Sequence, residues 1–154
     1  MTRYAAQTSV SVEKSRAEIE TILRRYGAKS FISGWAERRA YIGFEMGERR
    51  IKFIMPVPDP AEQRFTHSAR GIRTVEASHA IWEQACRQSW RALALVIKAK
   101  LEAVEAGISV FEDEFLAHIV LPDGRTVAEH TKPMIAAAYE SGKVQALLPD
   151  FSRP

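Results

Sequence analysis

Apolar residues recur every three or four positions in two long stretches of the chain, which is the spacing of an amphipathic helix. The first stretch predicts a helix from about residue 12 to residue 26, with Ser11 as its N-cap and Gly27 ending it. Its apolar face consists of Val12, Ile19, Ile22, Leu23 and Tyr26. The second stretch predicts a longer helix, from about residue 78 to residue 106, with Thr74 or Ser78 as its N-cap.

The long helix carries one apolar stripe, which we expect to lie across a sheet. At about 100° per residue, the stripe contains Trp82, Cys86, Leu93, Ile97 and Val104, flanked by Trp90 and Leu101. Trp90 lies at the edge of the stripe, where a tryptophan is typical of a protein–protein interface. The sequence therefore also predicts a homo-oligomer that uses this helix.

Between the two helices, apolar and polar residues alternate in segments 30–35, 39–46 and 49–57, which predicts three antiparallel strands. Gly47-Glu48 favours a two-residue type II′ turn, because glycine stands at its first position. This turn places Phe44 opposite Ile51. The resulting core face consists of Ala40, Ile42, Phe44, Ile51, Phe53 and Met55.

Two capping-box patterns follow the long helix, Ser109-Val-Phe-Glu112 and Thr126-Val-Ala-Glu129. They predict two shorter helices, the first reaching about residue 119 and the second ending near Gly142, split or kinked at Pro133. The chain is thus predicted to be α+β: an N-terminal helix, a three-stranded antiparallel sheet, a long amphipathic helix packed on the sheet, and two shorter C-terminal helices. Residues 11–142 form the predicted single domain, between an extension (1–10) and a loose tail (143–154).

Composition adds the expected compartment. The chain of 154 residues has one cysteine and therefore no internal disulfide, which is typical of a reducing compartment. Cys86 lies in the apolar stripe, so we interpret it as a core residue and not as a nucleophile. No apolar run is long enough to span a bilayer, so we expect no membrane partner and a cytoplasmic protein. The net charge of +3 permits an anionic partner without requiring one.

Motifs for catalysis or cofactor binding are absent from the sequence. It contains no Walker A loop, GxGxxG fingerprint, GxSxG elbow or HExxH helix. Glu114 and His118 are one helical turn apart, but two ligands do not make a zinc site. We therefore predict no catalytic residue, cofactor or metal, which favours a non-enzymatic protein while leaving an enzyme open.

Basic residues suggest an anionic partner. On the sheet face opposite the core, arginines and a lysine surround an aromatic ring, and nucleic-acid binders use this mixture for phosphates and bases. The predicted loop 59–73 and the long helix carry further arginines. The candidate nucleic-acid-binding residues are Arg39, Tyr41, Arg50, Lys52, Arg64, Arg70, Arg73, Arg87 and Arg91. The alternative for each group is an ordinary solvated face, with Glu45 pairing across the strands with Arg50.

Three segments resemble a family of small uncharacterised proteins from tailed bacteriophages and prophages. They are Tyr4-Ala-Ala-Gln-Thr-Ser-Val10, the stretch from Trp90 to Gly107, and Phe115-Leu-Ala-His-Ile-Val-Leu-Pro-Asp-Gly-Arg-Thr-Val127. The resemblance implies a viral accessory protein of the bacterial host cytoplasm. Such proteins commonly serve replication, transcription control or the defeat of host defences.

These observations favour an accessory protein that binds nucleic acid or a nucleoprotein complex through the basic sheet face and the adjacent loop. One alternative is a protein-binding inhibitor of a host defence or regulatory factor, with contacts on the long helix and the acidic third helix. Another is a sponge for a small signalling nucleotide, which would need a pocket that no motif predicts.

Overall fold

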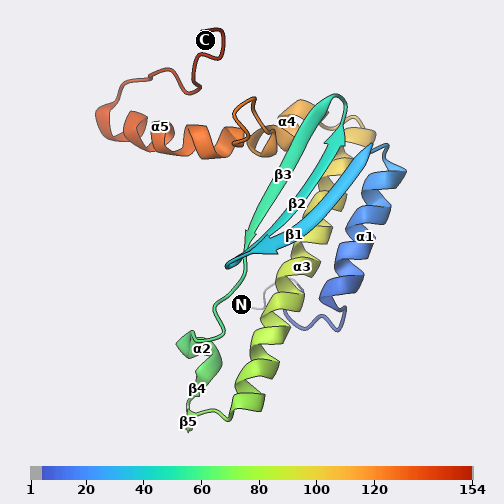
Figure 1. Cartoon of the computed structure of the whole chain (residues 1–154), viewed down its shortest axis with the longest axis vertical. Coiled ribbons are helices and arrows are strands. Elements are labelled where there is room, and N and C mark those ends of the chain that lie inside the picture. The colour runs from blue at the N-terminus through green and yellow to red at the C-terminus, as the bar shows by residue number, and fades with distance from the viewer. Residues whose placement is uncertain (1–4, 154) are drawn as a thin grey trace.

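In the computed structural model, which describes residues 5–153, a three-stranded sheet lies in front of two helices (Figure 1). Helix α1 (Val12–Arg25) leads into strands β1 (Ser30–Ala36), β2 (Arg39–Met46) and β3 (Arg49–Pro56). Next come α2 (Gln63–Thr66), the two-residue strands β4 (His67–Ser68) and β5 (Gly71–Ile72), and the long helix α3 (Val75–Glu105). Helix α4 (Phe111–Phe115), the 3₁₀ turn η1 (Leu116–His118) and α5 (Val127–Ser141) follow. The predicted α+β fold is confirmed.

The sheet has the order β1-β2-β3 and is antiparallel throughout, with Phe44 opposite Ile51 as predicted. The type II′ turn is wrong. Gly47 and Glu48 have φ of 57° and 62°, and two left-handed residues define a type I′ turn. Both turn types contain two residues, so the register was predicted correctly from the wrong turn.

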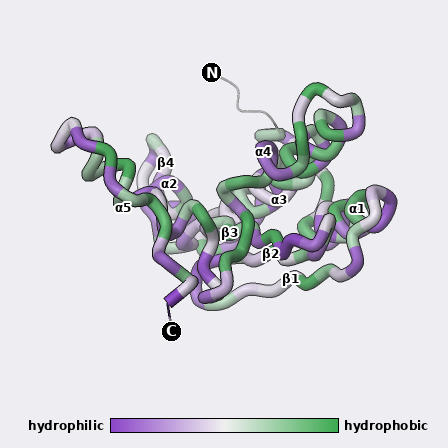
Figure 2. The backbone as a smooth tube through the Cα atoms, turned by 90° about the horizontal axis from the view of Figure 1, so that it is seen from above, coloured by the Kyte–Doolittle hydropathy of each residue, from purple (hydrophilic) through white to green (hydrophobic). Residues whose placement is uncertain are grey.

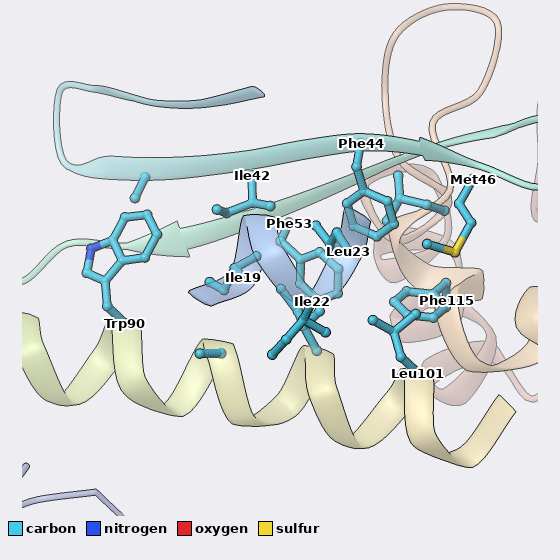
Figure 3. Close-up of a cluster of buried hydrophobic side chains, with 14 residues drawn as sticks. Ile19, Ile22, Leu23, Ile42, Phe44, Met46, Phe53, Trp90, Leu101 and Phe115 are labelled. Carbon is cyan, nitrogen blue, oxygen red and sulfur yellow. The ribbon is translucent and has the colours of Figure 1, made fainter. Parts of the chain in front are cut away.

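The core fills the space between the back of the sheet and helices α1 and α3 (Figure 3). Its fully buried side chains include Ile19, Leu23, Ile42, Ile51, Ile97 and Leu101. Phe115 closes one end of this core, with its ring edge-on to Phe44 and Phe53 at centroid distances of 6.0 and 6.2 Å. The short α4 therefore contributes its one buried residue to the main core.

Helix α3 begins after Thr74, whose side chain accepts a hydrogen bond from the backbone of Ala77. Its buried residues are Trp90, Ala94, Ile97 and Leu101, so the apolar stripe is rotated from the predicted one. Trp90, which was predicted as an interface residue at the edge of the stripe, is 7% exposed and belongs to the core. Helix α1 packs on α3 beside the sheet. It covers a flank of α3 that the spacing of apolar residues alone did not assign to the core.

The described part of the predicted N-terminal extension docks on α3. The side-chain amide of Gln84 donates hydrogen bonds to the carbonyls of Ala6 and Thr8, at 3.1 and 2.9 Å. Residues 1–4 of that extension lie outside the described residues, as does Pro154 of the predicted tail.

The C-terminal helices differ from prediction in their caps. Val110 precedes α4 and makes no side-chain cap, so the capping box predicted at Ser109 is wrong. The capping box of Thr126 and Glu129 is confirmed. Helix α5 is continuous through Pro133 and is not split there.

Helix α5 extends away from the sheet and the other helices, and none of its residues is buried (Figures 1 and 2). The tail that follows has no helix or strand up to residue 153, and Phe151 contacts the ring of His130 edge-on. No helix in the described residues is long and apolar enough to cross a membrane.

Candidate nucleic-acid interface

The outer face of the sheet, which is the face turned away from α1 and α3, is not covered by any helix or strand of residues 5–153 (Figure 1). Strand register assigns its residues, because directly paired residues point to the same side. Across the three strands, the successive rows are Ala36–Arg39–Pro56, Gly34–Tyr41–Ile54, Ile32–Gly43–Lys52 and Ser30–Glu45–Arg50. The four predicted sheet residues Arg39, Tyr41, Arg50 and Lys52 therefore share this one face.

The outer face carries three cations, and one of them lies near a carboxylate: a hydrogen bond from the Thr126 backbone and then the charge of Lys52 lower the pKa of Glu129. Arg39, Arg50 and Lys52 form no ion pair with any residue in the described range. Glu45 is directly opposite Arg50, but the predicted pair does not form, and the Glu45 carboxylate accepts a hydrogen bond from Ser30 at 3.4 Å. The Lys52 ammonium lies 5.5 Å from the centre of the Tyr41 ring. The face thus keeps a net positive charge around one aromatic ring.

Two glycines lower the surface beside that ring. Gly34 is the direct β1 partner of Tyr41, and a Cβ built at this position meets nothing within 4 Å. Gly43, two residues along β2, has only the Ile51 carbonyl oxygen near its Cβ position, at 3.8 Å. Glycine inside a strand often marks the close approach of a ligand or another backbone. The surface next to Tyr41 is therefore low and free of side chains, and a planar group can lie on it.

The predicted basic loop, residues 59–73, is folded and lies beyond the end of the sheet, beside the first turns of α3 (Figure 1). The Arg73 guanidinium donates to the carbonyls of Arg64 and Phe65, at 3.0 and 2.9 Å, so it holds the loop together. Arg64 stacks on the Phe65 ring and bonds Glu62 at 2.7 Å. Arg70 is exposed. The loop therefore does not lie on the sheet face, and its predicted contact with the same partner stays a prediction.

The basic residues of α3 also lie apart from the outer face. Arg91 pairs with Glu18 of α1, and Arg87 donates to the Gln84 side chain at 3.0 and 2.6 Å. Helix α3 packs behind the sheet, so the sheet separates these guanidiniums from Tyr41 (Figure 1). Arg87 and Arg91, predicted as candidate nucleic-acid-binding residues, are therefore not part of the outer face.

Carboxylates and histidines near α4 have structural partners. Glu114 bonds Lys100 at 3.3 Å, and hydrogen bonds from Ser109 and Lys100 lower its pKa. His118 stacks on Phe53 with ring centres 3.9 Å apart, and burial lowers the pKa of its imidazole. Within residues 5–153, no group of three or more histidine, cysteine, aspartate or glutamate side chains could hold a metal ion.

The outer face includes residues that the sequence did not single out, Gly34 and the 73%-exposed Ile32 on β1. The signal available for Gly34 was an isolated glycine inside an alternating strand. It gained meaning only once pairing placed it beside Tyr41.

Comparisons of the chain with protein-family models, with curated proteins and with solved structures find no match. The resemblance to proteins of tailed phages therefore stays a prediction. The candidate site has to be judged on its own geometry and charge.

Proposed function

We propose that this protein is a non-enzymatic accessory protein that binds single-stranded nucleic acid on the outer face of its sheet. The observation that carries the proposal is the sheet face that no other described element covers, on which Arg39 and Lys52 flank the row of Tyr41, Arg50 lies further along, and none of the three forms an ion pair within residues 5–153. Unpaired cations attract phosphates, and an aromatic ring on a flat surface stacks on a base.

A single strand fits this face better than a duplex does. Bases of a single strand can be splayed out onto aromatic side chains, whereas in a duplex they are stacked on each other and inaccessible. The open floor at Gly34 and Gly43 lies beside Tyr41, where a base in contact with its ring would rest. Lys52 and Arg39 are then the nearest cations for the flanking phosphates.

The test is binding of labelled single-stranded and duplex DNA and RNA, measured by fluorescence anisotropy across a salt series. Gly34→Val places a side chain on the floor beside Tyr41 at a position with ordinary backbone and free space. We expect at least about a fivefold loss of single-strand affinity, since stacking on one aromatic ring contributes about 1–3 kcal/mol. Arg50→Gln should reduce the slope of log affinity against log salt by about 0.7, the value for one phosphate contact on a single strand.

Lys98→Gln is the matched control, because Lys98 is an exposed cation on α3, behind the sheet. It should leave affinity nearly unchanged. Absence of binding even at low salt, or equal binding by wild type, Gly34→Val and Arg50→Gln, refutes the proposal.

The alternative function, a protein-binding inhibitor, relied on the acidic helix α4 as a contact surface, and the structure gives this surface little free charge. Glu112 pairs with Arg49 at 2.7 Å and Glu114 pairs with Lys100, so two of the three acidic side chains of α4 already have cationic partners. Capture from nuclease-treated host lysate distinguishes the two functions. A stoichiometric protein partner that survives nuclease, with no affinity for single strands, would favour the alternative.

A further inference from the structure

All three tryptophans of the chain line one pocket of about 520 Å³ behind the sheet. Trp35 comes from the end of β1, and Trp82 and Trp90 come from α3, with Cys86 one turn from each. The first turn of α1 supplies Arg16 to the same pocket. The volume is within the range of small-molecule sites.

The α3 side of the pocket consists of two indole rings and Cys86, with the charged side chains of Glu83 and Arg87 beside them. The Trp82 indole N–H donates to the carbonyl of Pro58 at 2.7 Å, which holds that ring in place. Burial raises the pKa of the Cys86 thiol, so the side chain between the two indoles is uncharged. Trp35 stands opposite and is 79% exposed, which leaves its ring free to cover a ligand. These walls suit a planar, uncharged ring system.

One polar group inside the pocket lacks a protein partner. The Trp90 side chain is 7% exposed, yet its indole N–H bonds no residue in the range 5–153 and is not sealed from the pocket. Figure 3 shows its nitrogen on the side of the ring away from the other labelled core side chains, toward the earlier turns of α3. Because this nitrogen is accessible, water or an acceptor on a bound molecule can take its hydrogen bond.

Charged side chains at the mouth of the pocket indicate which chemical groups the rest of the ligand carries. Arg16 and Arg87 line it, and neither forms an ion pair with a carboxylate in the described part of the chain. Guanidinium groups are suited to phosphate because their N–H groups match its oxygens. Glu13, Glu37 and Glu83 also belong to the lining, so its charged side chains carry one more negative than positive charge. These carboxylates can accept hydrogen bonds from an exocyclic amino group.

We propose that this pocket binds a nucleotide, with its base between Trp35 and the α3 indoles, the Trp90 N–H on a base acceptor and its phosphate at Arg16. The nucleotide is either a free molecule or one unit of a strand. Tryptophans with carboxylates can also enclose a quaternary ammonium group. The Trp90 donor and the Arg16 guanidinium, which has no ion-pair partner among the described residues, favour an anion with acceptors. Arg87 is engaged by Gln84, and the choline titration tests the cation that the carboxylates of the lining would bind.

The tryptophan fluorescence of the intact protein reports directly on this site, because no tryptophan lies elsewhere. Nucleoside 5′-monophosphates, a short single-stranded oligonucleotide and choline are each titrated, with calorimetry as a second readout. We expect saturable quenching by at least one of the two nucleotide forms. Trp35→Ala and Arg16→Gln should each weaken that binding at least about tenfold.

Arg24→Gln is the matched control, with the same substitution two turns further along α1 at an exposed arginine. It should bind like wild type. Gly34→Val tests independence from the sheet face, and it should leave mononucleotide binding unchanged.

The two sources of the nucleotide give different results. Mononucleotide binding that depends on Trp35 and Arg16 supports a free ligand. Binding of the oligonucleotide alone, with the same dependence, supports a unit of a strand. No quenching and no heat with either form, binding that survives both substitutions, or saturable choline binding overturns the proposal, whatever the outcome for Gly34→Val.

Discussion

Replacing Ser15 with alanine should stabilise this protein. Ser15 lies on the face of α1 that packs into the core, it is fully buried, and its hydroxyl has no hydrogen-bond partner among the described residues. A buried polar group without a partner costs about 1–3 kcal/mol of desolvation. The hydroxyl therefore weakens the same helix that supplies Arg16 to the tryptophan pocket.

Two smaller effects modify this estimate. Alanine has a higher helix propensity than serine, which adds roughly 0.5 kcal/mol. Loss of the oxygen leaves a void of roughly 15 Å³, which at about 24 cal/mol per Å³ costs about 0.4 kcal/mol. These nearly cancel, so we expect the free energy of unfolding to rise by about 1–3 kcal/mol. For a chain of this length, that raises Tm by about 3–9 °C.

The assay is urea denaturation followed by circular dichroism, with Thr21→Ala as the control. Thr21 lies on the same helix but is exposed, and its hydroxyl donates to the Ala17 carbonyl at 3.0 Å. That variant should change stability by no more than about 0.5 kcal/mol. If Ser15→Ala is less stable than wild type, the hydroxyl contributes to the core and the reasoning fails.

Two further predictions concern the C-terminal part. The Arg125 side chain donates to the Glu129 carbonyl at 3.1 Å, the group that Pro133 leaves without a helical donor. Arg125→Ala should therefore open α5 more easily, by about 1 kcal/mol in hydrogen exchange, and Pro133→Ala should remove the effect because alanine supplies the N–H. Burial lowers the pKa of His118 in the folded protein, so the folded state resists protonation of this imidazole. The free energy of unfolding should therefore be highest above the ordinary histidine pKa of 6.5 and should fall as the pH drops through the pKa of the folded state. His118→Phe should flatten this acid limb in denaturation curves, and an unchanged limb would contradict the assignment.

The sheet was predictable because two local signals agreed. Alternation assigned Ile42 and Phe53 to one face, and a two-residue turn at Gly47 fixed their pairing. A one-residue slip would have put this whole apolar set into water, so the register had little freedom. The same alternation placed Arg39, Tyr41, Arg50 and Lys52 together on the outer face.

Long-range packing was not predictable to the same degree. Periodicity gave α3 its length, but which flank is most buried depends on where α1 packs, and the burial of Trp90 followed from that contact. The loop arginines were predicted as a free surface, whereas Arg73 is committed to backbone carbonyls nine and eight residues earlier. The tryptophan pocket joins the start of α1, the end of β1 and the middle of α3, and no local pattern connects those segments.

The outer face and the tryptophan pocket come close in the chain at the end of β1. Trp35 pairs with Ala40, which is next to Arg39 in β2. A nucleic-acid strand that lies on the outer face and leaves it past Arg39 therefore passes the end of β1. If one strand engages both surfaces, affinity should rise steeply once the oligonucleotide spans them, because the second contact becomes intramolecular. Lys52→Ala and Arg16→Gln would then weaken the same binding event, and their free energies should add because the residues lie on opposite sides of the sheet. A smooth dependence on length, with oligonucleotide affinity untouched by Arg16→Gln, would instead mean that the two surfaces act separately.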